Sequence, residues 1–213
     1  MAQPLDVIMA FHNAFRRDMA TIDTAALAWA RGQNGLDGTI ERYRFFNEIL
    51  IWHAIGEEKE IYPVLEGVAP LVAEAYVMDH HGLDAAGEGL HTAFASGDPL
   101  QTARAAAAFK FHLDLHLKKE DAHLYRLFRE RVPMPEQGQA VGRMSTHVPQ
   151  ERFPEVVAWL FPLLELDDRE NTTRIFQSAL PAPAFVGVKA LIRQAVGDGW
   201  AELAARIPAL LED

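Results

Sequence analysis

The sequence predicts an all-α protein, an up-down-up-down four-helix bundle followed by a C-terminal helical extension. Strand-like alternation is nearly absent, and Ala, Leu, Glu and Arg dominate long stretches in which apolar residues recur every three or four positions. Four such stretches, each of about 25 to 30 residues, are joined by short connections, which make successive helices antiparallel.

The first two helices are bounded by glycine and proline signals. We expect the first over about residues 5–31, with Phe11 and Phe15 on its apolar stripe, ending at Gly32. Residues 32–38 are polar and form a connection. The second helix begins near residue 39 and continues until Pro63 or Gly67 disturbs it.

The third and fourth helices are separated by a strong break. The third is expected over about residues 70–95, with a proline tolerated at its start. Ser96-Gly97-Asp98-Pro99 then ends it and supplies an N-cap for the fourth, which continues to about residue 131. Residues 1–132 are therefore assigned to the bundle.

Residues 133–213 have a different texture, with several prolines and shorter amphipathic pieces such as 156–164 and 200–211. The acidic run at 167–170 is typical of a capped helix start. We expect four or five short helices packed against the bundle. The sequence leaves open whether they form a second domain or cover one flank.

Composition excludes several classes of function. The net charge of -10 and pI of about 5.3 argue against nucleic acid and acidic membranes, which need clustered Lys and Arg. The absence of cysteine removes disulfides, thiolate ligands and cysteine nucleophiles. No apolar run approaches a bilayer span and the N-terminus lacks a signal-peptide core, so we expect a cytoplasmic location. A homodimer stays open, and no motif names a partner protein.

One pattern occurs twice, 63 residues apart. The copies are His53-x3-Glu57-Glu58-x2-Ile61-Tyr62 and His116-x3-Glu120-Asp121-x2-Leu124-Tyr125. Side chains at i and i+4 share one helix face, so each copy supplies half of a metal-binding surface. Two exposed helical pairs, each worth about 0.2–0.5 kcal/mol, are the alternative. The shared tyrosine and apolar pattern favours metal binding.

Two further histidines lie at matching depth. At about 1.5 Å per residue, antiparallel neighbours bring His12 and His80 to the height of the two repeated histidines. The spacing therefore indicates one interior site. His81 points about 100° away from His80, so only one of them faces the site, and we favour His80. His112, one turn before His116 on the same face, is a candidate extra ligand or a hydrogen-bond donor to a ligand.

These residues resemble the hemerythrin-like family, the HHE cation-binding domains, over residues 5–131. The resemblance implies two iron ions bridged by the two carboxylates, with an oxo or hydroxo bridge when oxidised and the histidines as terminal ligands. The implied ligands are His12, His53, Glu57, His80, His116 and Glu120. Nitrogen and oxygen donors suit iron, with manganese or zinc as competitors.

The chain departs from the family in two places. Many members have His-His where this chain has Trp52-His53, and the oxygen carriers have a second third-helix histidine where this chain has Asp84. A coordination position is then open, or Asp84 or a tyrosine fills it. Tyr62 and Tyr125 are expected to pack in the core with satisfied hydroxyls, and hydrogen bonding to the ligands or electron transfer is the alternative.

The charged residues beside the repeated glutamates are not expected to bind metal directly. Glu58, Glu60 and Asp121 are expected to be solvated, although Glu58 could help to orient a ligand. His91, His123 and His147 are expected at the surface.

Three functions remain open. The first is a di-iron protein that binds or reacts with O2, hydrogen peroxide or nitric oxide, as an oxidoreductase if it turns over, without a protein nucleophile and with no catalytic residue assigned. The second is an iron or oxygen sensor or carrier without turnover. The third is an oxygenase in which residues 136–213 form a pocket for an organic substrate. The aromatic residues Phe153, Trp159, Phe161 and Trp200 permit this, but such spacing is more often plain core.

Overall fold

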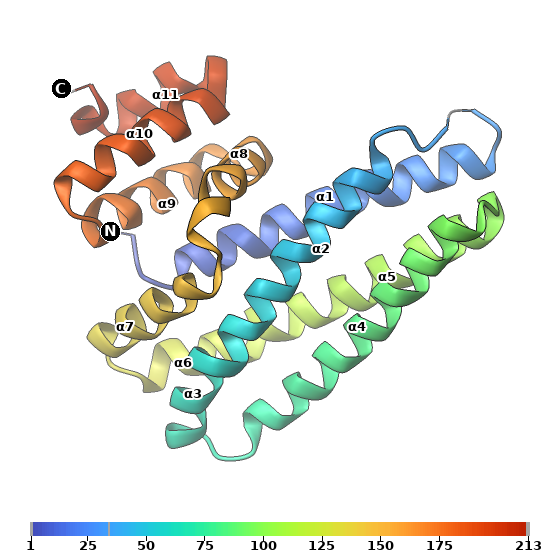
Figure 1. Ribbon diagram of the computed structural model, residues 1–213. Coiled ribbons are helices and arrows are strands. Elements are labelled where there is room, and N and C mark those ends of the chain that lie inside the picture. Colours follow the sequence, from blue (N-terminus) through green and yellow to red (C-terminus); the bar gives the residue numbers. More distant parts are fainter. Residues whose placement is uncertain (1, 34, 212–213) are drawn as a thin grey trace.

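The computed structural model describes residues 2–33 and 35–211, and its main body is a four-helix bundle (Figure 1). The long helices are α1 (Asp6–Ala30), α2 (Thr39–Gly56), α4 (Val72–Ser96) and α5 (Pro99–Lys119). Helix α1 packs on α2 and α5, and α4 packs on the same two helices. The predicted all-α class is confirmed, since no strand occurs within the described ranges.

The helix ends follow the sequence signals closely. Gly32 and Gly38 both have positive φ, which marks the two ends of the connection between α1 and α2. The Asp98 carboxylate accepts hydrogen bonds from the backbone amides of Leu100 and Gln101, as an N-cap does. Helix α4 begins later than predicted, because Leu71 before it has φ of 70° and cannot continue a right-handed helix.

The second and fourth helices each contain a π-helical turn that the sequence analysis did not foresee. A π turn at Glu57–Ile61 follows α2 and leads into α3 (Tyr62–Val68). A second at Glu120–Leu124 follows α5 and leads into α6 (Tyr125–Arg131). The second helix was predicted to continue until Pro63 or Gly67 disturbs it; the helical stretch passes Pro63, in the first turn of α3, and ends at Val68, one residue after Gly67.

The π turns change which side chains share a face. The amide of Tyr62 bonds to the carbonyl of Glu57, and the amide of Tyr125 to that of Glu120, five residues back instead of four. In an α-helix, a residue five positions further on lies about 140° around the axis. The wider turn removes much of that rotation. Each tyrosine therefore returns to the face of its glutamate.

The polar residues of the bundle lie between two apolar layers. In α1, Ile8 belongs to one buried cluster and Phe15 to the other, with buried His12 between them. In α5, Leu113 belongs to the second cluster and precedes His116 by three residues. The site is thus enclosed along the bundle axis by packed apolar side chains.

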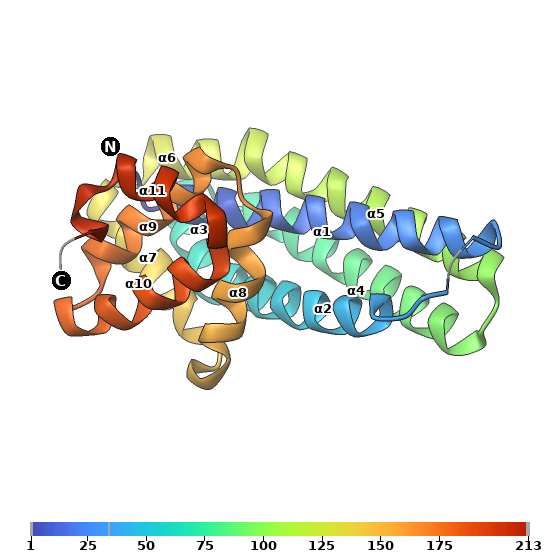
Figure 2. The same cartoon turned by 90° about the horizontal axis from the view of Figure 1, so that it is seen from above.

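The C-terminal segment forms five α-helices and several short 3-10 turns within the described part of the chain. They are α7 (Met134–Met144), α8 (Phe153–Leu163), α9 (Leu166–Ala179), α10 (Ala182–Val196) and α11 (Trp200–Arg206). Helix α7 lies against α2 and the first π turn, while α8 and α9 lie against α1. Figures 1 and 2 show these helices gathered at one end of the bundle, leaving its other end uncovered.

Polar contacts fasten this segment to α1. The indole of Trp159 donates to buried Asp18 at 2.6 Å, and Asn13 donates to Asp168 at 2.9 Å. The helix start predicted at residues 167–170 is confirmed, since α9 begins at Leu166 with Asp167 and Asp168 in its first turn, but its N-cap residue Glu165 makes no side-chain cap. The domain boundary at residue 132 stays a prediction. No helix among the described residues is long and apolar enough to cross a bilayer.

Gly56 allows α7 to approach α2 closely, because a side chain at this position would collide with Met144. A Cβ at Gly56 would lie 2.5 Å from Cγ of Met144 and 3.3 Å from its carbonyl oxygen, whereas Gly67 has open space. We expect Gly56→Ala to destabilise the fold by about 1–3 kcal/mol through overpacking. Gly67→Ala should stabilise it by about 0.5–1 kcal/mol. Urea unfolding measures both, and equal effects would contradict this account of Gly56.

Candidate metal centre

The structure brings all six predicted site residues together inside the bundle. His12, Glu57 and Glu120 are fully buried. The other three, His53, His80 and His116, are between 4% and 7% exposed. They come from all four long helices and from the first residue of each π turn. A cluster of this kind is costly to bury unless its charges are matched.

The six residues form two groups that share one carboxylate. Glu57, with His12 and His53, makes the first group. Glu57 also belongs to the second, with His80, His116 and Glu120. Within each group the candidate ligand atoms all lie within 4.8 Å of one another.

Glu57 faces both groups through different oxygens. Its Oε1 lies 3.1 Å from Nε2 of His53, and its Oε2 lies 3.4 Å from Nε2 of His80. The ring nitrogens of His12 and His53 are 3.1 Å apart.

Glu120 has a similar place on the other side of the cluster. Its Oε2 lies 3.3 Å from Nε2 of His116 and 3.6 Å from Nε2 of His12. The Oε2 atoms of Glu57 and Glu120 are buried without a hydrogen-bond partner. Buried carboxylate oxygens without partners are rare and call for a cation. The donor set, its burial and these two oxygens therefore fit metal ions.

Tyr62 and Tyr125 exchange hydrogen bonds between the two repeats. The Tyr62 hydroxyl donates to Glu120 Oε1 at 2.9 Å, and the Tyr125 hydroxyl donates to Glu57 Oε1. Each tyrosine thus holds the glutamate of the other copy. Both tyrosines are buried in an apolar cluster, as expected, and the π turns direct their hydroxyls to the glutamates, which agrees with the alternative of hydrogen bonding to the ligands.

The acidic residue after each repeated glutamate holds a histidine. Glu58 Oε1 lies 2.7 Å from Nδ1 of His80, and Asp121 Oδ1 lies 2.7 Å from Nδ1 of His12. Such a contact fixes the ring and directs Nε2 toward the cluster. Asp121 also pairs with Arg16. The expectation of a solvated charge is therefore wrong for Asp121, and the alternative orienting role of Glu58 agrees with the structure.

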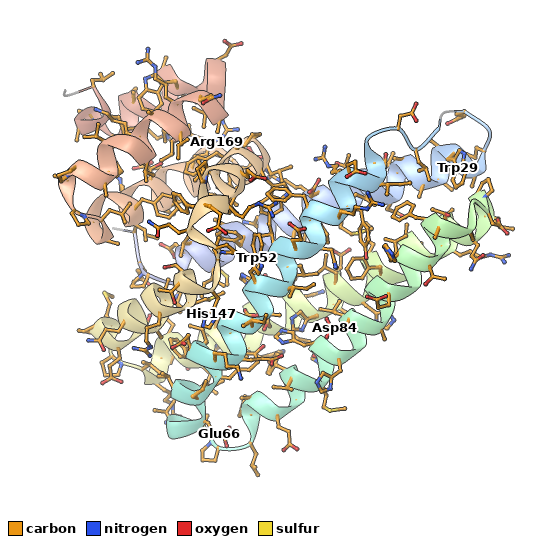
Figure 3. All side chains as sticks on the ribbon, viewed as in Figure 1. Trp29, Trp52, Glu66, Asp84, His147 and Arg169 are labelled. Carbon is orange, nitrogen blue, oxygen red and sulfur yellow. The ribbon has the colours of Figure 1, made fainter. Side chains whose placement is uncertain are left out.

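The remaining candidates lie outside the cluster. Asp84, His81 and His112 are exposed and belong to neither group. Asp84 on α4 (Figure 3) borders a cavity of about 20 Å³ that is also lined by His53, Glu57, His80 and His116. A space of this size holds about one water molecule. Glu60, expected to be solvated, is partly exposed and also pairs with Arg143 at 2.7 Å and with His147 at 3.2 Å.

Burial and neighbouring charges raise the pKa values of some residues of the cluster and lower those of others. Burial opposes the charged form of His12, but Asp121 and Glu57 outweigh it and raise the pKa of His12 to about 9. Glu57 and Glu58 outweigh the effect of burial in the same way and raise the pKa of His80 to about 9. Burial, together with the charge of Glu57, raises the pKa of Glu120 to about 8.

The other two histidines are neutral. Burial lowers the pKa of His53, and it lowers that of His116 to about 3. The pKa of Glu57 is held well below its usual value, because the facing histidines outweigh its burial. Glu57 is thus the carboxylate that stays ionised in the metal-free cluster.

A four-helix bundle whose interior gathers histidines and glutamates into two groups with a shared carboxylate is a cation-binding protein by its fold and donor set. The family model of the Hemerythrin HHE cation binding domain matches residues 3–128. The chain belongs to this family, as the repeated pattern predicted.

One curated relative extends the comparison. The zinc finger protein BRUTUS of Arabidopsis thaliana is 24% identical over 185 residues, which cover 84% of this chain and 15% of that protein. The chain thus spans a small part of this relative. A match over 84% of the chain cannot be confined to residues 3–128, so it continues into the C-terminal helices. No solved structure matches the chain.

Removing the tyrosine hydroxyls should weaken metal binding. Tyr62→Phe and Tyr125→Phe each leave a buried carboxylate oxygen without its donor, and such supporting groups typically contribute about 10-fold to 100-fold in metal affinity. Tyr43→Phe is the control, because its hydroxyl donates to Gly87 outside the cluster. Competition with a chelator measures the affinities. Equal affinities in all three variants would show that the tyrosines only fill space.

Metal binding should release protons. At pH 7 the metal-free cluster keeps protons on His12, His80 and Glu120, whose pKa values are about 9, 9 and 8. A metal ion needs these lone pairs, so the apparent affinity should rise from pH 6 to about pH 9 and then level off. Proton release on adding Co²⁺ in weak buffer measures the effect. A flat affinity over this range would contradict these protonation states.

Proposed function

We propose that this protein holds two iron ions in the buried cluster, and that the iron pair binds or reacts with O2, hydrogen peroxide or nitric oxide. One observation carries the proposal. The candidate ligands form two groups joined by Glu57, and the unpaired Oε2 atoms of Glu57 and Glu120 face the ring nitrogens of His80 and His116. Two adjacent cations satisfy such an arrangement better than one.

In this proposal the cluster divides between the ions. His12 and His53 would hold one ion and His80 and His116 the other, with carboxylate oxygens supplied by Glu57 and Glu120. Imidazole and carboxylate without thiolate suit iron better than structural zinc. When bound, the iron pair supplies the electrons and the Lewis acidity, so no protein nucleophile is required.

The side chains of the chain prepare this site. Glu58 and Asp121 fix the rings of His80 and His12, and the tyrosine hydroxyls fix the carboxylates of Glu120 and Glu57. Burial and the nearby glutamates raise the pKa of Tyr62, so its hydroxyl stays protonated and donates. The cavity of about 20 Å³ beside the histidines has room for a molecule the size of water, which favours ligands of two or a few atoms.

A sensor without turnover is the second candidate, and a specific contact favours it. Helix α7 lies on the π turn that begins at Glu57. Met144 packs against Gly56, and Arg143 pairs with Glu60 in the same turn. A displacement of Glu57 on metal binding would therefore alter the contacts between this π turn and α7. The cytoplasmic location stays a prediction, and so does the possibility of a homodimer.

Iron content and spectrum test the proposal. Protein from iron-supplemented cells should carry about two irons per chain and show diferric charge-transfer bands that dithionite removes. Repeated consumption of peroxide or nitric oxide would favour an enzyme, and a stable reversible O2 adduct a carrier or sensor. Less than about half an iron per chain, with zinc or nothing in its place, would reject the di-iron proposal.

Ligand variants test the assignment of the residues. His53→Ala and Glu120→Ala should lower bound iron and the melting temperature together, because the metal offsets the cost of burying the cluster. His112→Ala is the matched control, since this histidine is exposed on the same helix as His116. Full iron content and an unchanged melting temperature in either ligand variant would refute the assignment.

A further inference from the structure

A second, larger cavity lies between the bundle and the C-terminal helices. Its volume is about 380 Å³, and residues of α1, α2, α7, α8 and α9 line it. Its deep wall is formed by buried apolar side chains, among them Ile8, Ile49, Val157 and Leu160. Gly142 and Ser178 also line it and are exposed, so the cavity opens to solvent there. It is distinct from the small cavity beside Asp84.

The size of this cavity indicates a ligand rather than a packing defect. Protein interiors contain few voids larger than a water molecule, and sites for small molecules typically measure about 300–1,000 Å³. The cavity falls within that range. It is also enclosed by two parts of the chain that meet there, which is a common place for ligand sites.

The chemistry of the walls selects the ligand. Among the described residues that line the cavity, none is Asp, Glu, Lys or Arg, and the polar side chains are His53, Ser145, Ser178 and the indole of Trp52. An ionised ligand would lose its hydration without gaining a counter-charge. A protein segment would bring backbone amides for which these walls offer few partners. A neutral apolar molecule has neither cost and gains by leaving water.

His53 connects this cavity with the metal cluster. It lines both cavities and belongs to the first ligand group. The ring of Phe11, another lining residue, stacks on the His53 ring at 5.9 Å between centroids. Trp52, in the position where many relatives carry a histidine, lies on α2 (Figure 3) and lines the cavity as well. An occupant would thus lie directly against a candidate metal ligand.

We propose that this cavity binds a neutral, largely aliphatic or aromatic organic molecule carrying at most a hydroxyl or carbonyl group. The proposal does not depend on iron, because the walls are apolar side chains of α1, α2 and the C-terminal helices. It assigns the segment after residue 132 a function of its own, which is to complete a ligand site over the face of α1 and α2.

Binding of the neutral fluorescent probe N-phenyl-1-naphthylamine to the full chain, with and without metal, tests the proposal. We expect saturable binding of one probe per chain in both forms, with a blue-shifted emission. Addition of 1-decanol should displace the probe, whereas decanoate at pH 8 should be at least tenfold weaker, because only its charge differs greatly. Absence of saturable binding, or equal displacement by both competitors, would overturn the proposal.

A pair of glycines supplies matched variants. Gly142 and Gly187 are exposed helical glycines with open space where a Cβ would be added, but only Gly142 lines the cavity. Gly142→Phe should weaken probe binding at least tenfold, and Gly187→Phe should leave it unchanged. Val141→Phe, on the same wall, is a second filling variant. Melting curves and circular dichroism establish that each variant is folded.

The outcomes separate this proposal from the di-iron one. Loss of iron in Glu120→Ala, a residue that does not line this cavity, with intact probe binding would leave the cavity proposal standing. Unchanged probe affinity in both folded filling variants would place the probe elsewhere and refute it. A shift to dimers that blocks the probe would show that a second copy of the chain, and not a small molecule, covers the cavity.

Discussion

The fold is organised around the burial of four histidines and two glutamates between two apolar layers of one bundle. Burial, together with repulsion by the charge of Glu57, raises the pKa of Glu120 to about 8, while the facing histidines keep Glu57 ionised. The surrounding contacts reduce the cost of this burial. Tyrosine hydroxyls donate to the carboxylates, and acidic side chains hold the imidazoles. The Oε2 atoms of Glu57 and Glu120 keep this cost, because they are buried without a hydrogen-bond partner.

The two π turns make this arrangement possible. Each begins at a repeated glutamate and brings the tyrosine five residues later back to the same face. Because the turns occur in both copies of the pattern, the hydroxyl of each tyrosine donates to the glutamate of the other copy. The two copies of the pattern therefore supply equivalent hydrogen bonds as well as equivalent candidate ligands. A straight α-helix would direct the same tyrosines away from the cluster.

The C-terminal helices connect this interior to the outside. They contact the site through the first π turn, where Gly56 lets Met144 approach, and they enclose an apolar cavity that reaches His53. One segment thus adjoins a candidate ligand from one side and the backbone of Glu57 from the other. This position is consistent with both a sensing role and a role in presenting an organic molecule, and the experiments above separate the two.

The sequence by itself determined the helical class, the break at Asp98 and the six residues that meet inside the bundle, because helix periodicity and i, i+4 spacing are local properties. It did not determine the π turns, the exchange of tyrosines, the holding of His12 by Asp121 or the apolar cavity. A repeated acidic residue after each glutamate was a visible signal for the pairing. The rest depends on which helices face one another and how closely, and packing between residues distant in the chain decides that only in the tertiary structure.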